Sequence, residues 1–210
     1  MPLLLERHID DHIHIGIWKI EEGDEATFRE IPLSESDRAI LQSIRNPGKQ
    51  LQRLACRATL LQITGNRDLV IHYDEYRKPH LPGSGTHLSL THTGNMAAAM
   101  LNTRGPAGID LELPTMRIFA VRPRFLSLIE QQEDQHAGDL LKQTIFWSAK
   151  EALFKFEGKR VLSFSRDLYI HPFDPAPQGI LTAEIRMKHS NETQRLAWDT
   201  IEGYILVHTL

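Results

Sequence analysis

The sequence repeats a pattern of residues after 93 positions, and no gap is needed to align the two copies. Lys49-Gln50 corresponds to Lys142-Gln143, which lie 93 positions later, and 54–65 corresponds to 147–158. Further along, the matched positions are Leu69 with Leu162, Asp74 with Asp167, and Tyr76 with Tyr169. A repeat of this length predicts that one order of strands and helices occurs twice in the chain. We expect half-domains over 1–104 and 105–210, with the boundary in the turn-rich segment 102–106.

Hydrophobic periodicity indicates the elements of the first copy. Ile13, Ile15 and Ile17 alternate with other residues, which is typical of a strand. Ser34 is suited to begin a helix, and Gly65 to end one. On these patterns we predict helices over 34–43 and 48–63 and strands over 12–20, 69–73, 87–91 and 96–101. The fold class that follows is α+β, with two similar α/β half-domains in a pseudo-twofold arrangement.

Composition and charge exclude several classes of protein. The 210 residues are 41% hydrophobic and 24% charged, enough to bury a core. A net charge of -3 argues against a nucleic-acid partner, because such proteins carry clustered Lys and Arg in excess. The single cysteine, Cys56, favours a reducing compartment, and no apolar run reaches membrane-spanning length. We therefore expect a cytoplasmic protein that binds neither nucleic acid nor membrane.

Two acidic residues alternate with apolar ones in the segment 107–113, which reads AGIDLEL. On an extended strand the side chains of Asp110 and Glu112 project from one face, and those of Ile109 and Leu111 from the other. Carboxylate oxygens are the ligands that Mg²⁺ prefers. The strand therefore offers half of a divalent-metal site, although such a pair can also be an ordinary exposed strand face.

A helix predicted over 146–156 offers a further carboxylate and an ammonium group. Glu151 and Lys155 fall on one helical stripe, and an apolar stripe lies opposite. Taken alone, such a pair is most often a surface ion pair. The first copy has no equivalent of these groups, because Ile17, Lys19, Ala58 and Gln62 stand at the matching positions. The repeat therefore predicts one competent site, formed where the half-domains meet.

These motifs resemble those of the Sfp-type 4′-phosphopantetheinyl transferases. The strand motif G-I-D-x-E is present at 108–112, and the helix motif W-S-x-K-E-x-x-x-K at 147–155. Weaker similarities lie at 88–94, at Arg77-Lys78-Pro79, where the family usually has Gly-Lys-Pro, and at 124–130. The ordered set spans about residues 56–159. It is more specific than any of its fragments.

The resemblance implies a fold, a reaction and a set of site residues. It implies Mg²⁺-dependent transfer of the phosphopantetheine arm of coenzyme A to a serine of an apo acyl or peptidyl carrier protein. By motif, Asp110 and Glu112 hold Mg²⁺, and Glu151 completes the coordination, acts as general base on the carrier serine, or does both in turn. The segment 124–130 resembles the family segment that supplies a further acidic residue to the metal, here Glu130. Glu151, Lys155 and Asp110 are the expected catalytic residues, with Lys155 keeping Glu151 ionised. The residues expected to bind coenzyme A are Arg57, Lys78, Pro79, Thr91, His92, Lys150 and Lys155.

Several alternatives remain open on the sequence. A protein of the same fold can bind coenzyme A or a carrier protein without transferring anything, and an unrelated Mg²⁺-dependent phosphotransferase is a more distant possibility. Arg57 is as compatible with a solvated helix position as with phosphate binding. His8, His12 and His14, with Asp10 and Asp11, suggest a metal cluster, but alternation with isoleucine favours an exposed strand face. Because both half-domains belong to one chain, we expect a monomer.

Overall fold

The computed structural model describes residues 3–158, 162–187 and 190–210, so Lys159, the last residue of the resemblance, lies outside it. The chain forms two compact units, Met1–Ala107 and Gly108–Leu210. The expected boundary after residue 104 and this observed boundary fall in the same loop. In the described part of the chain, every helix is too short or too polar to span a lipid bilayer.

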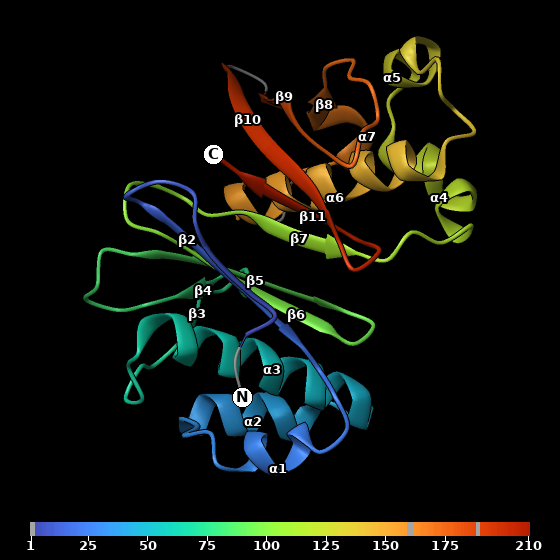
Figure 1. The fold of residues 1–210 in the computed structure, drawn as a ribbon. Coiled ribbons are helices and arrows are strands. Elements are labelled where there is room, and N and C mark those ends of the chain that lie inside the picture. Colours follow the sequence, from blue (N-terminus) through green and yellow to red (C-terminus); the bar gives the residue numbers. More distant parts are fainter. Residues whose placement is uncertain (1–2, 159–161, 188–189) are drawn as a thin grey trace. The chain divides into compact units, whose positions relative to one another are not determined.

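The first unit is an antiparallel sheet with helices against it (Figure 1). Its strands follow the spatial order β1-β2-β6-β5-β4-β3. Helix α3 packs on β2, β5 and β6, and its apolar side chains form the core with theirs. The elements are β1 (Leu5–His8), β2 (Ile13–Lys19), α1 (Asp24–Arg29), α2 (Glu35–Ser43), α3 (Pro47–Thr64), β3 (His72–Tyr73), β4 (Pro79–His80), β5 (His87–Thr93) and β6 (Met96–Asn102).

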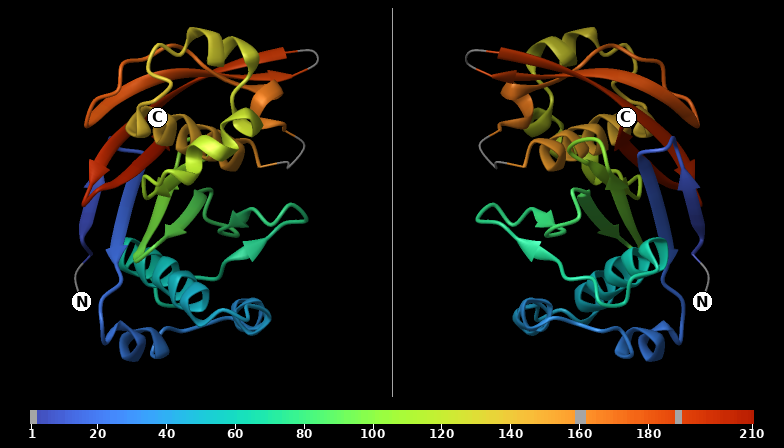
Figure 2. Two further views of the ribbon diagram at one scale, coloured as in Figure 1. Left: turned by 90° about the vertical axis from the view of Figure 1, so that its right-hand side faces the viewer. Right: turned by 90° about the vertical axis from the view of Figure 1, so that its left-hand side faces the viewer.

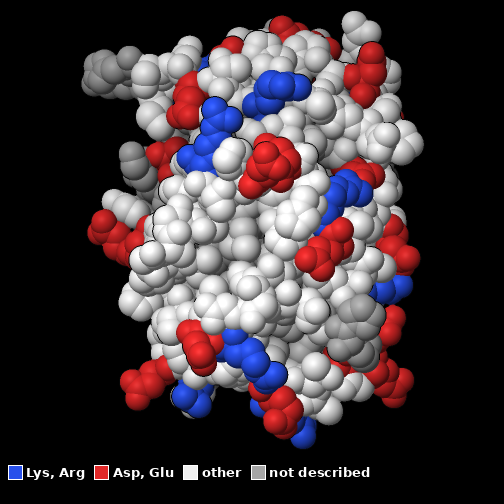
Figure 3. All heavy atoms as spheres, turned by 60° about the vertical axis from the view of Figure 1, so that its left-hand side comes forward, with Lys and Arg blue, Asp and Glu red and all other residues white. Residues whose placement is uncertain are grey.

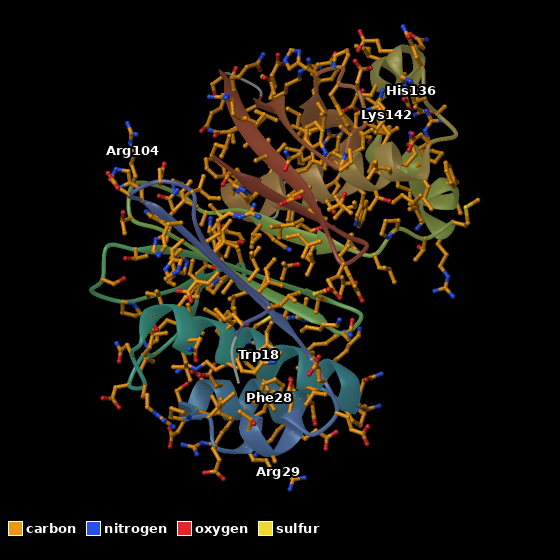
Figure 4. The ribbon with its side chains drawn as sticks, viewed as in Figure 1. Trp18, Phe28, Arg29, Arg104, His136 and Lys142 are labelled. Carbon is orange, nitrogen blue, oxygen red and sulfur yellow. The ribbon has the colours of Figure 1, made fainter. Side chains whose placement is uncertain are left out.

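Helices α2 and α3 begin and end within about one residue of the predicted bounds, whereas α1 was not predicted from the sequence. The hydroxyl group of Ser34 accepts a hydrogen bond from the backbone N–H of Asp37, whose carboxylate in turn accepts one from Ser34. Asn46 caps α3, and Gly65 ends it in the left-handed conformation. Beneath α3, Trp18 and Phe28 point toward each other with ring centroids 5.5 Å apart (Figure 4).

The second unit is also an antiparallel sheet, with strand order β7-β11-β10-β9-β8. Helix α6 lies along one face of this sheet and contacts β7, β8 and β11 (Figure 2). Its core joins α6 to the inward side chains of β8 to β11. The elements are β7 (Ile109–Glu112), α4 (Arg117–Phe125), α5 (Leu128–Glu133), α6 (Leu140–Glu157), α7 (Phe164–Asp167), β8 (Leu168–Ile170), β9 (Gln178–Met187), β10 (Ser190–Ile201) and β11 (Tyr204–Thr209).

The two units share one order of elements, and this agrees with an α+β fold built from a repeat. Apart from β1 in the first unit and α7 in the second, each has a strand, three helices and then four strands, and β2-β6-β5-β4-β3 matches β7-β11-β10-β9-β8 in spatial order. The 93-position shift superposes α3 on α6 from end to end, since 47 and 64 become 140 and 157. Beyond these helices the gapless alignment is wrong. It puts β5 on β9, whereas the sheet order matches β5 with β10.

Charged side chains are mixed over the face of the molecule drawn in Figure 3. Among the described residues visible there, Lys and Arg lie interspersed with Asp and Glu, without a broad patch of one sign. Nucleic-acid-binding surfaces depend on such a basic patch. The arrangement on this face agrees with the small net charge of -3.

Candidate metal and anion sites

The predicted acidic residues of the second unit come together where β7 packs against α6. Gly108, just before β7, allows this close approach, because a Cβ atom there would lie 2.2 Å from the carbonyl oxygen of Ala152. Asp110 follows on β7, and Glu151 lies beside Ala152 on α6. The glycine of the G-I-D-x-E motif therefore has a packing role, since it brings the strand carboxylates to the helix that carries Glu151.

Neighbouring side chains orient two groups of this cluster. The ammonium group of Lys155 donates to Oδ1 of Asp110 at 2.7 Å and to the backbone carbonyl of Ile109 at 3.0 Å. The indole N–H of Trp147 donates to Oε1 of Glu112 at 3.2 Å. Asp110 is 4% exposed, so its carboxylate lies in a medium less polar than water. We call Asp110, Glu112, Glu151 and Lys155 the acidic cluster.

The environment of Glu151 favours its protonated form. Burial, followed by the negative charge of Asp110, raises its pKa to about 7, and the charge of Glu112 acts in the same direction. Lys155 lowers the pKa of Glu151 but does not outweigh the other effects. Lys155 thus acts in the predicted direction, but a pKa of about 7 leaves Glu151 only partly ionised near neutral pH in the protein alone. Three carboxylates held close together require a further cation to be ionised at once, and this donor set suits Mg²⁺.

The three carboxylates of the acidic cluster lie near one another, but their oxygen atoms are not all within 4.8 Å of one another. In the described ranges, the only three residues that place His, Cys, Asp or Glu ligand atoms within 4.8 Å of one another are Glu6, His8 and His14. Mutual repulsion of the carboxylates and the ion pair between Lys155 and Asp110 explain why the acidic cluster is wider.

Glu130 and Lys150 lie together in a different, fully buried cluster. The ammonium group of Lys150 lies 2.7 Å from each oxygen of Glu130 and also donates to the backbone carbonyls of Phe125, Phe164 and Leu168. Glu130 accepts further hydrogen bonds from the backbone N–H groups of Ser127 and Ile170. None of these partners belongs to the acidic cluster. Burial lowers the pKa of Lys150 to about 8 despite the opposing effect of Glu130.

The repeat shows that this buried pair has a counterpart in the first unit. Asp37 and Arg57 stand 93 positions before Glu130 and Lys150, and their Oδ2 and Nε atoms are 3.9 Å apart. Both acids also complete the capping box at the start of a helix. The first unit lacks the acidic cluster. A pair that is present in both units is therefore explained by a structural role in the fold and not by metal binding. These contacts do not bring Glu130 to the metal site or Lys150 to a surface where coenzyme A can reach it.

Replacing Glu130 by glutamine is expected to lower the free energy of unfolding by about 2 kcal/mol, because Lys150 stays buried without its carboxylate partner. Mg²⁺ affinity is expected to remain unchanged. Denaturant unfolding and Mg²⁺ titration measure the two effects separately, with Glu133→Gln as the control, since it removes the same charge from an exposed position of the same helix. A large loss of Mg²⁺ affinity in Glu130→Gln alone would restore Glu130 as a metal ligand.

Three of the residues predicted to bind coenzyme A line one cavity of the first unit. Arg57, Pro79 and His92 contribute to its wall, and its volume is about 170 Å³. Arg53 and Arg77 also line it. Two nitrogens of Arg57, Nε and Nη1, and Nη2 of Arg53 are buried without a hydrogen-bond partner. Buried donors of this kind favour an anionic ligand, because a phosphate group satisfies their hydrogen bonds.

The remaining residues predicted for coenzyme A are placed differently. His92 lies within β5 and not in a turn after it, so Thr91 and His92 project from opposite faces of the strand. Thr91 is 6% exposed and does not line the cavity. Lys78 also lies outside the cavity lining, and its backbone N–H donates to Oδ1 of Asp74.

Arg77 has a backbone conformation that is unfavourable for any residue with a side chain. Its φ angle is 61°, in the left-handed region, at the position where the transferases that the motifs resemble usually have glycine. We expect Arg77→Gly to raise the free energy of unfolding by about 1 kcal/mol, because the strain is relieved. The same change removes a cation from the cavity and should weaken coenzyme A binding. Thermal unfolding and calorimetric titration with coenzyme A measure the two effects. Arg77→Ala, which keeps the strain, is the control and should weaken binding without the gain in stability.

Two residues with contacts to these sites were not predicted as functional. Arg53 lies four positions before Arg57, so helical spacing places it on the same face of α3, and its guanidinium stacks over the ring of Tyr73. Trp147 begins the helix motif, packs against Phe125 and also orients Glu112.

No protein-family model matches this chain, and a search of curated proteins finds no significant match. The function is therefore inferred from the motifs and from the geometry of the two sites.

Proposed function

We propose that the protein transfers the 4′-phosphopantetheine moiety of coenzyme A to a serine of an apo acyl or peptidyl carrier protein. The reaction depends on Mg²⁺ and releases adenosine 3′,5′-bisphosphate. The observation that carries this proposal is the acidic cluster, in which Lys155 pairs with Asp110 and the charges of Asp110, Glu112 and Lys155 all act on Glu151. The G-I-D-x-E and W-S-x-K-E-x-x-x-K motifs supply all four of these side chains.

The donor set of the acidic cluster fits a divalent cation. Asp110, Glu112 and Glu151 would hold Mg²⁺, which when bound supplies positive charge to the pyrophosphate of coenzyme A. The raised pKa of Glu151 supports this assignment, because burial and then the negative charges of Asp110 and Glu112 disfavour its ionised form, and a divalent cation would offset both effects.

The residues of the cluster have complementary roles in the transfer. In the reaction, a bond forms between the serine oxygen and the β-phosphorus, and the bond from that phosphorus to the bridging oxygen breaks. Glu151, with a pKa of about 7, is suited to accept the proton of the serine hydroxyl group. Lys155 is held by Asp110 and faces the negative charge that develops on the leaving phosphate.

The cavity of the first unit is suited to the nucleotide end of coenzyme A. Its three arginine side chains, Arg53, Arg57 and Arg77, offer several N–H donors to phosphate, and Asp37, Tyr73 and His92 are further polar residues in its wall. In the second unit a cavity of about 160 Å³ opens beside Glu112 and is lined by Trp147, Ile118 and Val121. These apolar side chains are compatible with the pantetheine arm, and Glu112, Thr115, Arg117 and Thr144 add polar groups to the wall.

The experiment that tests the proposal is incubation with Mg²⁺, coenzyme A and a panel of apo carrier proteins. We expect the mass of phosphopantetheine to appear on one serine of at least one carrier protein. If no carrier gains mass while coenzyme A still binds, the protein is a binding module of the same fold. Variants in each cavity then separate the roles of the two units, with Arg57→Ala raising the KM for coenzyme A and leaving the carrier protein's KM unchanged.

A further inference from the structure

Two histidines face each other on the edge of the first sheet. His8 on β1 is the direct partner of His14 on β2, and the two strands lie side by side in blue in Figure 2. The backbone N–H of Ile9 donates to the carbonyl of Ile13, so the next pair, His8 and His14, is a non-hydrogen-bonded one. Facing Cα atoms at such positions are only about 4.5 Å apart. The imidazole rings are accordingly stacked, with centroids 3.8 Å apart.

A carboxylate completes this group of side chains. Glu6 precedes His8 by two residues, so both side chains project from the same face of β1. Oε1 of Glu6 lies 2.9 Å from Nε2 of His14, and a ligand atom from each of the three side chains lies within 4.8 Å of the others. We propose that Glu6, His8 and His14 bind one Zn²⁺ ion.

The chemistry of these donors selects the ion. Two imidazole nitrogens and one carboxylate oxygen are a ligand set typical of Zn²⁺ sites that keep a fourth position for water or another ligand. Mg²⁺ prefers oxygen donors and binds imidazole poorly. The Zn²⁺ site therefore differs from the acidic cluster in its ligands as well as in its place in the chain, and it does not depend on the proposed transferase activity.

The geometry requires only small side-chain movements. Zn–N bonds of about 2.0–2.1 Å in a tetrahedral site place ligand atoms about 3.3 Å apart. Glu6 and His14 are already close to this separation, and Zn²⁺ replaces the proton in their hydrogen bond. The ring of His8 must turn out of the stack, because stacked rings direct their nitrogen lone pairs in parallel. His8 and Glu6 are exposed, so core packing does not oppose this rotation.

The nearby polar residues are held away from the site. Nδ1 of His12 lies 3.1 Å from the hydroxyl oxygen of Thr103. Oδ1 of Asp10 accepts hydrogen bonds from the backbone N–H groups of His12 and Ile13, both at 2.8 Å. The proposed ligands therefore differ from those that the sequence suggests. His8 and His14 are common to both sets, Glu6 is added, and Asp10, Asp11 and His12 are not ligands. A bound ion joins the edge strand β1 to β2 and stabilises the folded state through its binding free energy.

Calorimetric titration of the chelator-treated protein with Zn²⁺, in the presence of excess Mg²⁺, tests the proposal. We expect one Zn²⁺ per chain, and at least about tenfold weaker binding in His8→Ala and in His14→Ala. His12→Ala is the matched control and should bind like the wild type. Glu6→Gln, which preserves shape and most of the packing, should also weaken binding.

A second measurement does not depend on calorimetry. Zn²⁺ should raise the unfolding temperature of the wild type and of His12→Ala, but not that of His14→Ala. The same result is expected in an Asp110→Ala background, because the acidic cluster plays no part in the site. The proposal is overturned if Zn²⁺ does not bind saturably, or if its affinity is equal in the wild type and in both His8→Ala and His14→Ala.

Discussion

Replacing Asp110 by alanine is expected to lower the rate of phosphopantetheine transfer by at least about 100-fold, because a metal ligand and the partner of Lys155 are lost together. Asp110 lies on β7, and its carboxylate accepts a hydrogen bond from Lys155 at 2.7 Å. The variant should show a similar loss of Mg²⁺ affinity. Asp110→Asn preserves the shape of the side chain, so it tests whether the charge is responsible.

The measurement is the transfer rate on the carrier protein identified by mass, together with Mg²⁺ titration and circular dichroism to establish that the variant is folded. Asp174→Asn is the control, since Asp174 is an exposed carboxylate of the same unit. Transfer at the wild-type rate by folded Asp110→Ala would remove this residue from the metal site and would contradict the proposed function.

Replacing Glu151 by glutamine is expected to stabilise the protein at high pH while lowering the transfer rate by about 100-fold or more. The pKa of Glu151 is raised from its ordinary value of 4.5 to about 7. Its carboxylate is therefore protonated at little cost below pH 4.5, and it must be ionised in an unfavourable environment above pH 7. The folded state loses stability between these limits, on the order of 3 kcal/mol in total.

Glutamine carries no charge, so the stability difference between Glu151→Gln and the wild type should be near zero at pH 4 and reach its full size by pH 8. Denaturant unfolding at both pH values measures it, and the exposed Glu75→Gln is the control. Mg²⁺ should stabilise the wild type at pH 8 more than it stabilises Glu151→Gln. A stability difference that does not change with pH would show that Glu151 does not titrate near neutrality.

The acidic cluster could be predicted because its members follow local rules. The alternation of Asp110 and Glu112 with apolar residues places both carboxylates on one face of a strand, and the four-residue spacing of Glu151 and Lys155 places them on one face of a helix. The structure confirms the strand as β7 and the helix as α6. Its contacts add the roles of Gly108 in the close packing and of Trp147 in holding Glu112.

Residues whose role depends on burial were harder to predict. Glu130 and Lys150 belong to motifs of the resemblance, yet they pair with each other in the interior. The repeat contains a signal for this pairing, because Asp37 and Arg57 occupy the matching positions in a unit without the acidic cluster. Charge and spacing alone do not show whether a lysine faces solvent, since the packing of its helix can turn the same residue toward solvent or toward the interior.

The sequence by itself determined β2, α3, β7 and α6 and the two motifs of the acidic cluster, because these depend on periodicities of about two and 3.6 residues along one chain. It did not predict β1, α1 or β4, and its gapless repeat misaligned the strands that follow α3 and α6. Only the tertiary structure decided which distant residues meet. The pairing of β1 with β2 brings Glu6 and His8 to His14, and the packing of α3 collects Arg53, Arg57 and His92 around one cavity. Such neighbours are selected by strand register and by the fit of apolar side chains in the core, which depend on the folded chain as a whole.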